Sequence, residues 1–321
     1  MLNIFSVTVP FFALVLCGYV AARRSWLPLA AIPGLNGFVL YFALPCMLYR
    51  FGATTPVAQL LDATVALVWL LCASVMVMFV ALGSLNRRTG WNDAAFGALV
   101  AAFSNTGFMG MPLLVALLGA QAVGPTIVTI AVDMLFTSSL CIALSRLDSA
   151  GTHGMAVAGR QALKGVLINP MPWAILLGAL ASALEWVLPG PVMRTVGLLA
   201  DAASPVALFT IGAVLARAQM MQVAKQQAPR PWRDFVPVAL IKLLLHPLLV
   251  LLAGSTAIQL GAPLPPYALT VLVLVAALPS ASNVSLLAER FEADNGRIAR
   301  IILVSTVVAF LTFPLAVALL T

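Results

Sequence analysis

The stretch PFFALVLCGYVAARRSWLPLAAIPGLNGFVLYFALPCMLYRFG, residues 10–52, decides how the rest of the chain is read. Five of its eight glycine and proline residues return, unchanged in type, 160 positions further on. Sites of helix bending and close packing change more slowly than other side chains, so this spacing indicates an internal duplication. In an apolar chain such a duplication is typical of transporters. The recurring pairs are Pro10 and Pro170, Gly18 and Gly178, Gly37 and Gly197, Pro45 and Pro205, and Gly52 and Gly212.

The composition excludes a soluble fold. Of the 321 residues, 62% are hydrophobic and 8% are charged, whereas a soluble domain carries about 25% charged residues. The surface must therefore face a lipid bilayer. The net charge of +7 is not gathered in a stripe or tail, so no nucleic-acid partner is expected. No disulfide or metal site is predicted from the cysteines, which all lie in apolar stretches without a CxxC motif: Cys17, Cys46, Cys72 and Cys141.

Ten apolar stretches are long enough to cross a bilayer, for which an α-helix needs about 20 residues. They cover residues 4–22, 30–50, 57–85, 93–119, 122–145, 163–186, 193–216, 234–254, 265–288 and 297–320. Fourteen of the seventeen basic residues fall in loops after odd-numbered spans, which supports this count. By the positive-inside rule those loops are cytoplasmic, and both termini lie outside the cytoplasm.

The duplication and the span count together predict an inverted repeat. A shift of 160 residues maps the first span onto the sixth and the second onto the seventh, so each repeat has five helices. Because five is odd, the second repeat enters the membrane from the opposite side. We therefore expect an all-α integral membrane protein with repeats at 1–147 and 163–321 and a cytoplasmic linker at 148–162.

Two spans contain interruptions rich in glycine, proline and polar residues. The fourth span holds SNTGFMGMP at 104–112, and the ninth holds LPSASN at 278–283. A proline kink explains one such break, but a symmetry-related pair favours crossing half-helices whose N-termini bind an anion. The candidate substrate-binding residues are Ser104, Asn105, Thr106, Gly107, Pro279, Ser280, Ser282 and Asn283.

Charged residues at membrane depth are costly and are the next candidates. Lys242 in the eighth span can neutralise a bound carboxylate, pair with Asp133, or reach an interface. Asp133 in the fifth span can hold a cation or a proton, or make a buried structural hydrogen bond. His246 fits a packed histidine better than a proton relay, and Asp201 fits a structural role. Two further candidates, for scaffold contacts or helix packing, are Asn36 and Asn169.

Enzyme signatures are missing from the sequence. It has no HExxH motif, no paired DxxxD motif, no Ser/His/Asp set in a suitable context and no Gly-rich phosphate loop. We expect no enzymatic activity and no cofactor, with Na⁺ or H⁺ as candidate coupling ions. A membrane sensor that binds its ligand without translocating it, and a channel, are the alternatives to a carrier.

The chain resembles the auxin efflux carrier family, within a wider group that includes bile acid sodium symporters. The resemblance covers essentially the whole length. It is most specific in LNGFVLYFALP at 35–45 and in the interruption that ends at Pro112. Asn169-Pro170 and the Ala-Ala-Leu-Pro run ending at Pro279 add to it. Within the family, the opening of the chain is most similar to malonate carriers.

This resemblance implies ten helices, a site where the fourth and ninth helices cross, and elevator-type alternating access. Spans 1, 2, 6 and 7 would form a scaffold, often a homodimer, while spans 3–5 and 8–10 would move with the substrate. It also implies a small organic anion, malonate or a similar dicarboxylate, carried across the bacterial inner membrane. Plant members have proline at both crossing points, whereas this chain has Ser104 opposite Pro279, so we expect the first crossing to be less sharply opened.

Overall fold

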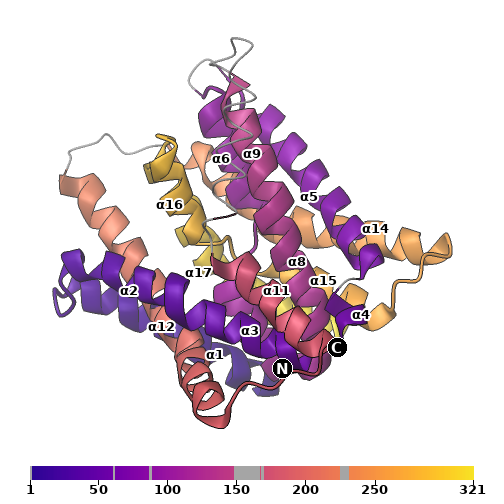
Figure 1. The fold of residues 1–321 in the computed structure, drawn as a ribbon. Helices are drawn as coiled ribbons and strands as arrows, with labels where there is room; N and C mark the ends of the chain where they lie inside the picture. Colours follow the sequence, from indigo (N-terminus) through magenta and orange to yellow (C-terminus); the bar gives the residue numbers. More distant parts are fainter. Residues whose placement is uncertain (1, 61, 87–88, 148–166, 168–169, 225–230) are drawn as a thin grey trace. The chain divides into compact units, whose positions relative to one another are not determined.

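The computed structural model describes residues 2–60, 62–86, 89–147, 167, 170–224 and 231–321. The regular elements in these residues are all helical, which confirms the predicted all-α class (Figure 1). Most are α-helices, joined by short 3-10 and π turns. The predicted linker at 148–162 and Asn169 lie outside the described residues.

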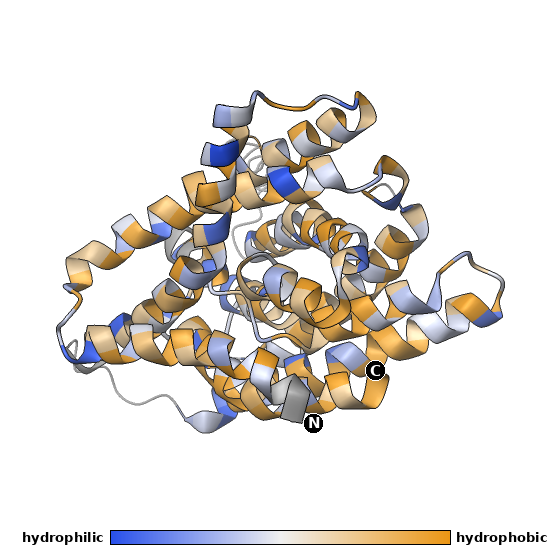
Figure 2. Cartoon of the chain, turned by 90° about the horizontal axis from the view of Figure 1, so that it is seen from below, coloured by the Kyte–Doolittle hydropathy of each residue, from blue (hydrophilic) through white to orange (hydrophobic). Residues whose placement is uncertain are grey.

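Seven helical stretches among the described residues are long and apolar enough to cross a membrane. They are Ser6–Arg23, Leu29–Thr54, Val57–Ser84, Ala120–Ser145, Gly190–Met221, Val236–Gln259 and Asn295–Leu320. The fourth and ninth predicted spans instead contain shorter apolar helices, Thr106–Leu118 and Pro266–Ala277, and the described part of the sixth contains Pro170–Ala183. Apolar residues predominate along most of the helices in Figure 2. These features fit a multi-pass membrane protein, while the total of ten helices stays a prediction.

The chain divides into two compact units, and each is described by itself. Unit 1 comprises Met1–Asp62, Thr106–Val128 and Asn169–Gln227. Pro33 stands in the first turn of the helix Ile32–Phe38, where the missing N–H costs no α-helical hydrogen bond, whereas Pro45 and Pro112 lie in the first turn after π-helical segments of continuous helices. Its elements are α1 (Leu2–Arg23), η1 (Leu29–Ala31), α2 (Ile32–Phe38), η2 (Val39–Ala43), α3 (Leu44–Thr54), α4 (Val57–Leu60), η3 (Thr106–Gly110), α7 (Met111–Leu118), η4 (Ala120–Ala122), α11 (Pro170–Ala183) and α12 (Gly190–Ala224).

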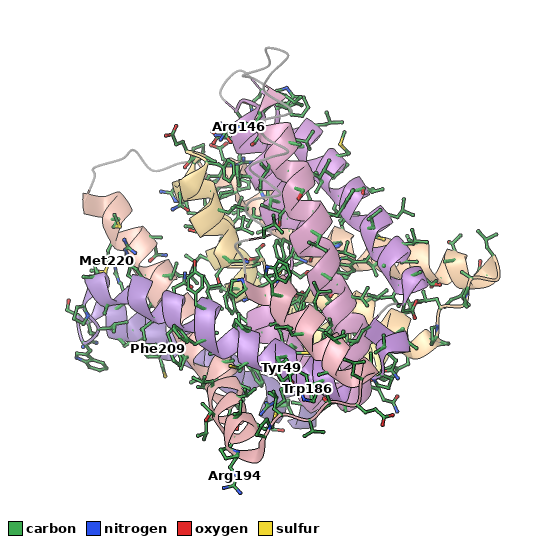
Figure 3. The ribbon with its side chains drawn as sticks, viewed as in Figure 1. Tyr49, Arg146, Trp186, Arg194, Phe209 and Met220 are labelled. Atoms are coloured by element: carbon green, nitrogen blue, oxygen red, sulfur yellow. The ribbon has the colours of Figure 1, made fainter. Side chains whose placement is uncertain are left out.

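Glycines let two helices of unit 1, α1 and α12, approach each other closely. A Cβ atom at Gly18 of α1 would overlap the carbonyl oxygen of Phe209 on α12. Conversely, a Cβ atom at Gly212 of α12 would overlap the carbonyl oxygen of Val15 on α1. Phe209 is labelled in Figure 3. Any side chain at either glycine would therefore force the two helix backbones apart.

A second close crossing joins α3 and α11. A Cβ atom at Gly178 of α11 would lie 2.7 Å from the carbonyl oxygen of Tyr49 on α3, which is labelled in Figure 3. A Cβ atom at Gly52 of α3 would lie 3.2 Å from the Cα atom of Gly178. In the 160-residue shift, Gly178 corresponds to Gly18 and Gly52 corresponds to Gly212. The second crossing thus uses the repeat equivalents of the glycines in the first.

Unit 2 comprises Ala63–Asn105, Thr129–Ile168 and Ala228–Thr321. Within it, α5 packs on α6 and α14, and α15 packs on α14 and α17. Helix α8 (Val123–Val132) runs from unit 1 into unit 2. The other elements are α5 (Ala63–Ser84), α6 (Trp91–Ala102), η5 (Asp133–Thr137), α9 (Ser138–Ser145), η7 (Trp232–Asp234), α13 (Val236–Leu240), η8 (Ile241–Leu245), α14 (His246–Gln259), α15 (Pro266–Ala277), α16 (Asn283–Arg290) and α17 (Asn295–Leu320).

The core of unit 2 is built around α6 and α15. Every residue from Ala94 to Ala102 of α6 is buried, and so is every residue from Val271 to Ala277 of α15. A helix that is apolar all round is buried on all faces, and both helices have this composition. Each of these buried helices leads directly into one of the predicted interruptions.

A buried arginine joins four elements at the other end of α6. The Arg297 residue on α17 is only 5% exposed, and its Nε atom donates to the Asp234 carbonyl oxygen at 2.9 Å. Its Nη1 atom donates to the Asp93 carbonyl oxygen at 3.0 Å, and its Nη2 atom to the Ser84 hydroxyl at 3.3 Å. Asp294 caps α17 by accepting from the Arg297 backbone N–H at 2.9 Å. This network fixes the ends of α5, α6 and α17 in unit 2.

Candidate functional site

Two helices of unit 2 stop at the predicted interruptions. Helix α6 ends at Ala102, and helix α15 ends at Ala277. Pro279 explains the second stop, because proline has no N–H to donate and disfavours the helical conformation in the residue before it. That residue, Leu278, is extended, with φ −63° and ψ 155°. The polar interruptions read from the sequence are therefore real breaks in the helices.

The two interrupted segments pair with each other inside unit 2. The backbone N–H of Asn105 donates to the carbonyl oxygen of Pro279 at 2.9 Å. The backbone N–H of Ala281 donates to the carbonyl oxygen of Phe103 at 3.0 Å. Backbone groups released by a break must find partners at membrane depth, and here each break supplies partners for the other.

Polar side chains surround this pairing. Ser104 and Ser280 stand opposite each other in the antiparallel bridge, and both are fully buried. Three buried atoms have no hydrogen-bond partner among the described residues: Oδ1 of Asn105, Oγ of Ser280 and Oδ1 of Asn283. Ser282, also buried, lies in the same segment. The pair of breaks thus presents neutral amides and hydroxyls, which can both donate and accept hydrogen bonds.

Lys242 contacts both breaks from η8. Its side chain is fully buried, and its Nζ atom donates to Ser104 Oγ at 2.7 Å and to the Ala276 carbonyl oxygen at 2.8 Å. It also lies 3.0 Å from Nδ1 of His246. In an unbroken helix the Ala276 carbonyl would accept from the N–H of Ser280, which here donates to a hydroxyl of α17 instead. The ammonium group therefore caps the carboxyl end of α15, where a positive charge is favourable.

Asp133 lies in a second buried network of unit 2. Its Oδ1 atom accepts from Trp69 Nε1 at 2.9 Å and from the Thr137 hydroxyl at 3.0 Å, while its Oδ2 atom has no partner among the described residues. The Trp69 ring packs against the His246 ring with centroids 5.2 Å apart, which connects Asp133 to the Lys242 network. Asp133 is the first residue of the π-helical segment η5, and Lys242 lies in the π-helical segment η8. Such segments are frequent at functional sites.

The remaining predicted site residues do not all fall in unit 2. Thr106 and Gly107 follow Asn105 in the chain and open η3, which belongs to unit 1. Thr106 is buried there. Asn36 lies half-buried in α2 of unit 1, and Asn169 is outside the described residues. The predicted residues that the structure joins through direct contacts or neighbouring positions are Ser104, Asn105, Pro279, Ser280, Ser282, Asn283 and Lys242.

Two residues of this network have roles that depend on contacts the sequence does not show. His246 is packed, as the sequence favours, against the Trp69 ring, and it also contacts Lys242. Trp69 does not stand out, because an aromatic residue in an apolar span is usually part of a core. One signal exists for the histidine, since residues four apart on a helix are neighbours and His246 follows Lys242 by four. No sequence signal relates Trp69 to Asp133.

Comparison with known proteins identifies the class of this chain. A model of the membrane transport protein family matches residues 3–317, which is almost the entire sequence. The chain belongs to the membrane transport protein family. This result confirms the predicted membrane transporter and, at family level, the resemblance to auxin efflux carriers.

Several relatives match the chain over most of its length. A Rhizobium meliloti (strain 1021) protein named "Putative malonate transporter" is 29% identical over 313 residues, covering 97% of this chain and 94% of the relative. "Uncharacterized transporter YfdV" of Escherichia coli (strain K12) is 28% identical over 287 residues, covering 88% and 86%. An "Uncharacterized transporter" of Methanothermobacter thermautotrophicus is 26% identical over 305 residues, covering 94% and 93%.

Proposed function

We propose that this protein is a secondary transporter of a small organic anion, with malonate or a similar dicarboxylate as its substrate. The observation that carries the proposal is the pair of broken helices lined by buried polar atoms without partners among the described residues. A buried polar group that lacks a partner costs free energy, and a substrate that bonds to it offsets that cost. Of these atoms the Ser280 hydroxyl can donate to a carboxylate oxygen, whereas Oδ1 of Asn105 and Oδ1 of Asn283 accept and therefore suit the O–H of a protonated carboxyl group; the amide NH₂ groups of the two asparagines are further donors.

The neutrality of these donors suits a carrier. A carrier must bind its substrate in both facing states and release it, so unequal or excessive affinity would trap one state. The Lys242 amino group lies behind Ser104, donates to Ser104 Oγ and to the Ala276 carbonyl oxygen, and lies 3.0 Å from Nδ1 of His246; when it is protonated it carries a positive charge. It favours an anion by charge without binding it directly. The name of the Rhizobium meliloti relative supports a dicarboxylate within this class.

An inverted repeat is the second part of the proposal. The exchange of glycine roles between the two crossings of unit 1 supports it, because Gly18 meets α12 while its equivalent Gly178 meets α3. A two-fold relation between halves would produce such an exchange. Inverted repeats let one sequence adopt two facing states, which is the basis of alternating access.

Elevator-type movement is the third part. We propose that spans 1, 2, 6 and 7, whose helices α1, α3, α11 and α12 all lie in unit 1, act as the scaffold and that spans 3–5 and 8–10 carry the substrate across the membrane. The presence of two separately compact units supports a division into two parts, although unit 1 also contains Thr106–Val128 of the fourth and fifth spans. The proposal places the carrier in the bacterial inner membrane as a homodimer, with both termini outside the cytoplasm. We also propose that the chain belongs to a wider superfamily that includes the bile acid sodium symporters.

Asn105→Ala tests the proposed site. The purified variant and the wild type would be compared for malonate binding by calorimetry and for uptake of labelled malonate into proteoliposomes. Because Asn105 supplies a side-chain group to the paired breaks, we expect the variant to lose both binding and uptake while its unfolding midpoint in detergent stays close to that of the wild type. Thr306→Val is the matched control, since this buried hydroxyl of unit 2 bonds within its own helix, to the Ile302 carbonyl oxygen at 2.7 Å.

Three results would contradict the proposal. Unchanged uptake kinetics in Asn105→Ala would exclude the paired breaks as the site. Malonate binding by the wild type without saturable uptake would instead favour a ligand sensor. Loss of uptake in both Asn105→Ala and the Thr306 control would show that uptake responds to general damage, and the paired breaks would lose their special role.

A further inference from the structure

A line of buried polar side chains runs through unit 2 from Asp133 to the paired breaks. It passes from the Asp133 carboxylate to Trp69, then to His246, to Lys242 and to Ser104. All five side chains have 0% exposure. Burying the ionised side chains of Lys242 and Asp133 in membrane-spanning segments costs free energy, and charged residues at that depth are usually functional.

Lys242 and His246 can hold or lack one proton without moving. With the proton, the ammonium group donates its three hydrogens to Ser104 Oγ, the Ala276 carbonyl oxygen and His246 Nδ1. Without it, the neutral amine still donates to the two oxygens, and its lone pair accepts from a hydrogen on Nδ1. The imidazole changes tautomer between the two states, which moves its hydrogen from Nε2 to Nδ1. The same heavy-atom geometry therefore satisfies the three contacts of Lys242 Nζ in both states.

The second ring nitrogen of His246, Nε2, is the atom at which a proton can bind to the cluster or leave it. Nε2 is buried and has no hydrogen-bond partner among the described residues. Release begins when Lys242 passes a proton to Nδ1, and the hydrogen on Nε2 then passes to a water molecule that reaches the ring during the transport cycle. Uptake runs in reverse: a proton binds at Nε2, and Nδ1 returns its hydrogen to the amine. One proton enters or leaves in each direction, and the ring ends neutral.

Asp133 supplies the opposing charge. Its Oδ1 atom accepts hydrogen bonds from Trp69 and Thr137. The same Trp69 indole packs against the His246 ring. The negative charge of Asp133 stabilises the protonated form of the Lys242 and His246 pair in a medium where charges interact strongly. Its Oδ2 atom, which has no partner among the described residues, is the other position in the cluster where a proton could bind.

Few other ionisable groups of the described residues face this cluster from the elements packed around it. Helix α5 contributes Cys72, whose Sγ atom lies 4.0 Å from the Leu249 carbonyl oxygen, and α9 contributes Cys141; both are buried thiols. Tyr267 stands at the start of α15, ten residues before its end. On α6 and α17 the charged groups are Asp93, Arg297 and Arg300; Asp93 and Arg297 meet at the far end of α6, and Arg300 lies over the Phe235 ring. The proton balance of the cluster therefore rests on the lysine, the histidine and the aspartate.

We infer that Lys242, His246 and Asp133 form a proton-binding site, and that a proton rather than sodium is the ion coupled to transport. The inference rests on the proposed function and names its coupling ion. Lys242 connects the site to both breaks, because it bonds to Ser104 beside α6 and caps the end of α15 at Ala276. The ammonium also takes the two oxygen acceptors that a hard cation such as sodium would need there.

Linkage then makes substrate and proton bind together. An anion at the breaks favours the protonated cluster by charge, and by reciprocity the protonated cluster favours the anion by the same factor. A carrier whose substrate and proton favour each other's binding moves the two across the membrane in the same direction. With one proton for each substrate and the membrane potential held at zero, the accumulation ratio changes about tenfold for each unit of pH difference.

The test uses the full-length protein in proteoliposomes with trapped pyranine, with valinomycin and potassium fixing the membrane potential. Exchange of labelled malonate for trapped malonate at equal pH reports transport itself. Net uptake under pH differences, in sodium or in choline buffer, reports coupling. We expect exchange in all buffers, about tenfold accumulation per pH unit with malonate-dependent proton entry, and no change when choline replaces sodium.

Variants separate a proton on the protein from a proton on the substrate. His246→Asn keeps an acceptor for Lys242 but has no second nitrogen that can take up a proton, so its accumulation should lose the tenfold dependence. Thr306→Val should keep it. If malonate accumulation in His246→Asn still changes about tenfold per unit of pH difference, or if uptake requires sodium, the inference is overturned while the proposed function stands. Absence of malonate exchange in the wild type would overturn the proposed function, and this inference with it.

Discussion

Alanine substitutions at the recurring glycines should destabilise the protein in an order set by the space around each one. At Gly18 and Gly212 an added methyl would overlap a backbone carbonyl oxygen of the opposite helix. Backbone cannot rotate away as a side chain can, so α1 and α12 must separate along their length. Overpacking of this kind costs about 1–3 kcal/mol and occasionally more, and we place these two sites at about 3 kcal/mol.

The remaining glycines define the rest of the series. At Gly178 the closest atom to the new methyl is 2.7 Å away, and at Gly52 it is 3.2 Å away. We expect losses of about 2 and about 1 kcal/mol, respectively, because smaller shifts relieve these contacts. Gly37 and Gly197 recur in the same repeat, but a Cβ atom at either one would have no neighbouring atom of the described residues within 4 Å. Alanine there should stabilise the helix by up to about 1 kcal/mol.

The assay is unfolding of each purified variant in one detergent, followed by tryptophan fluorescence against temperature and against denaturant. The expected order of stability runs from the Gly37 and Gly197 variants, through Gly52→Ala and Gly178→Ala, to Gly18→Ala and Gly212→Ala. Equal losses at all six sites would refute the reasoning, since they would show that glycine is needed for something other than close approach. So would a Gly18→Ala protein as stable as the wild type.

Three further substitutions test particular contacts. Asn105→Ala should abolish malonate uptake by proteoliposomes with little change in the unfolding midpoint, and unchanged kinetics would count against the site. Trp69→Phe removes one of two donors to Asp133 and should cost about 1–3 kcal/mol in denaturant unfolding; a neutral result would mean that the Trp69 bond is not important to the cluster. Arg297→Lys keeps the charge but cannot reach two backbone carbonyls and a hydroxyl together, so we expect a loss of about 1–3 kcal/mol by the same measurement.

Some parts of the site are predictable because their cause is local. Pro279 cannot donate a helical hydrogen bond and holds its neighbour extended, so the break after α15 follows from the sequence alone. The charges of Lys242 and Asp133 in apolar spans mark them as functional candidates for the same kind of reason. Asp201, expected to be structural, makes an ion pair with Arg50 at 2.7 Å.

Other parts depend on contacts between distant residues. The sequence suggests that Lys242 acts on a bound anion or on Asp133 or reaches an interface, yet its amino group contacts Ser104, His246 and the end of α15. Ser104 and Lys242 are 138 positions apart, and a single sequence carries no signal of such a contact. The bond from Trp69 to Asp133 is hidden for the same reason, since indole in an apolar helix looks like ordinary core.

Helix lengths are also only partly predictable. Apolar composition locates seven long helices, but the fourth and ninth spans contain shorter ones among the described residues. Hydropathy measures whether a segment prefers lipid to water, not whether its backbone stays helical throughout. In the fourth and ninth spans the backbone groups that leave the helix are satisfied by pairing between Asn105 and Pro279 and between Ala281 and Phe103. The recurring glycines include those at both close crossings, Gly18 with Gly212 and Gly52 with Gly178, but the spacing alone does not distinguish them from Gly37 and Gly197, which make no close contact with other described residues.

Counterflow of labelled malonate into proteoliposomes loaded with unlabelled malonate tests the central claim most directly. It needs no gradient and no knowledge of the coupling ion. The account predicts saturable counterflow that small dicarboxylates inhibit and that malonamide, the uncharged diamide of the same shape, does not. Counterflow that is absent for malonate and for other small carboxylates, in protein that remains folded, would contradict it.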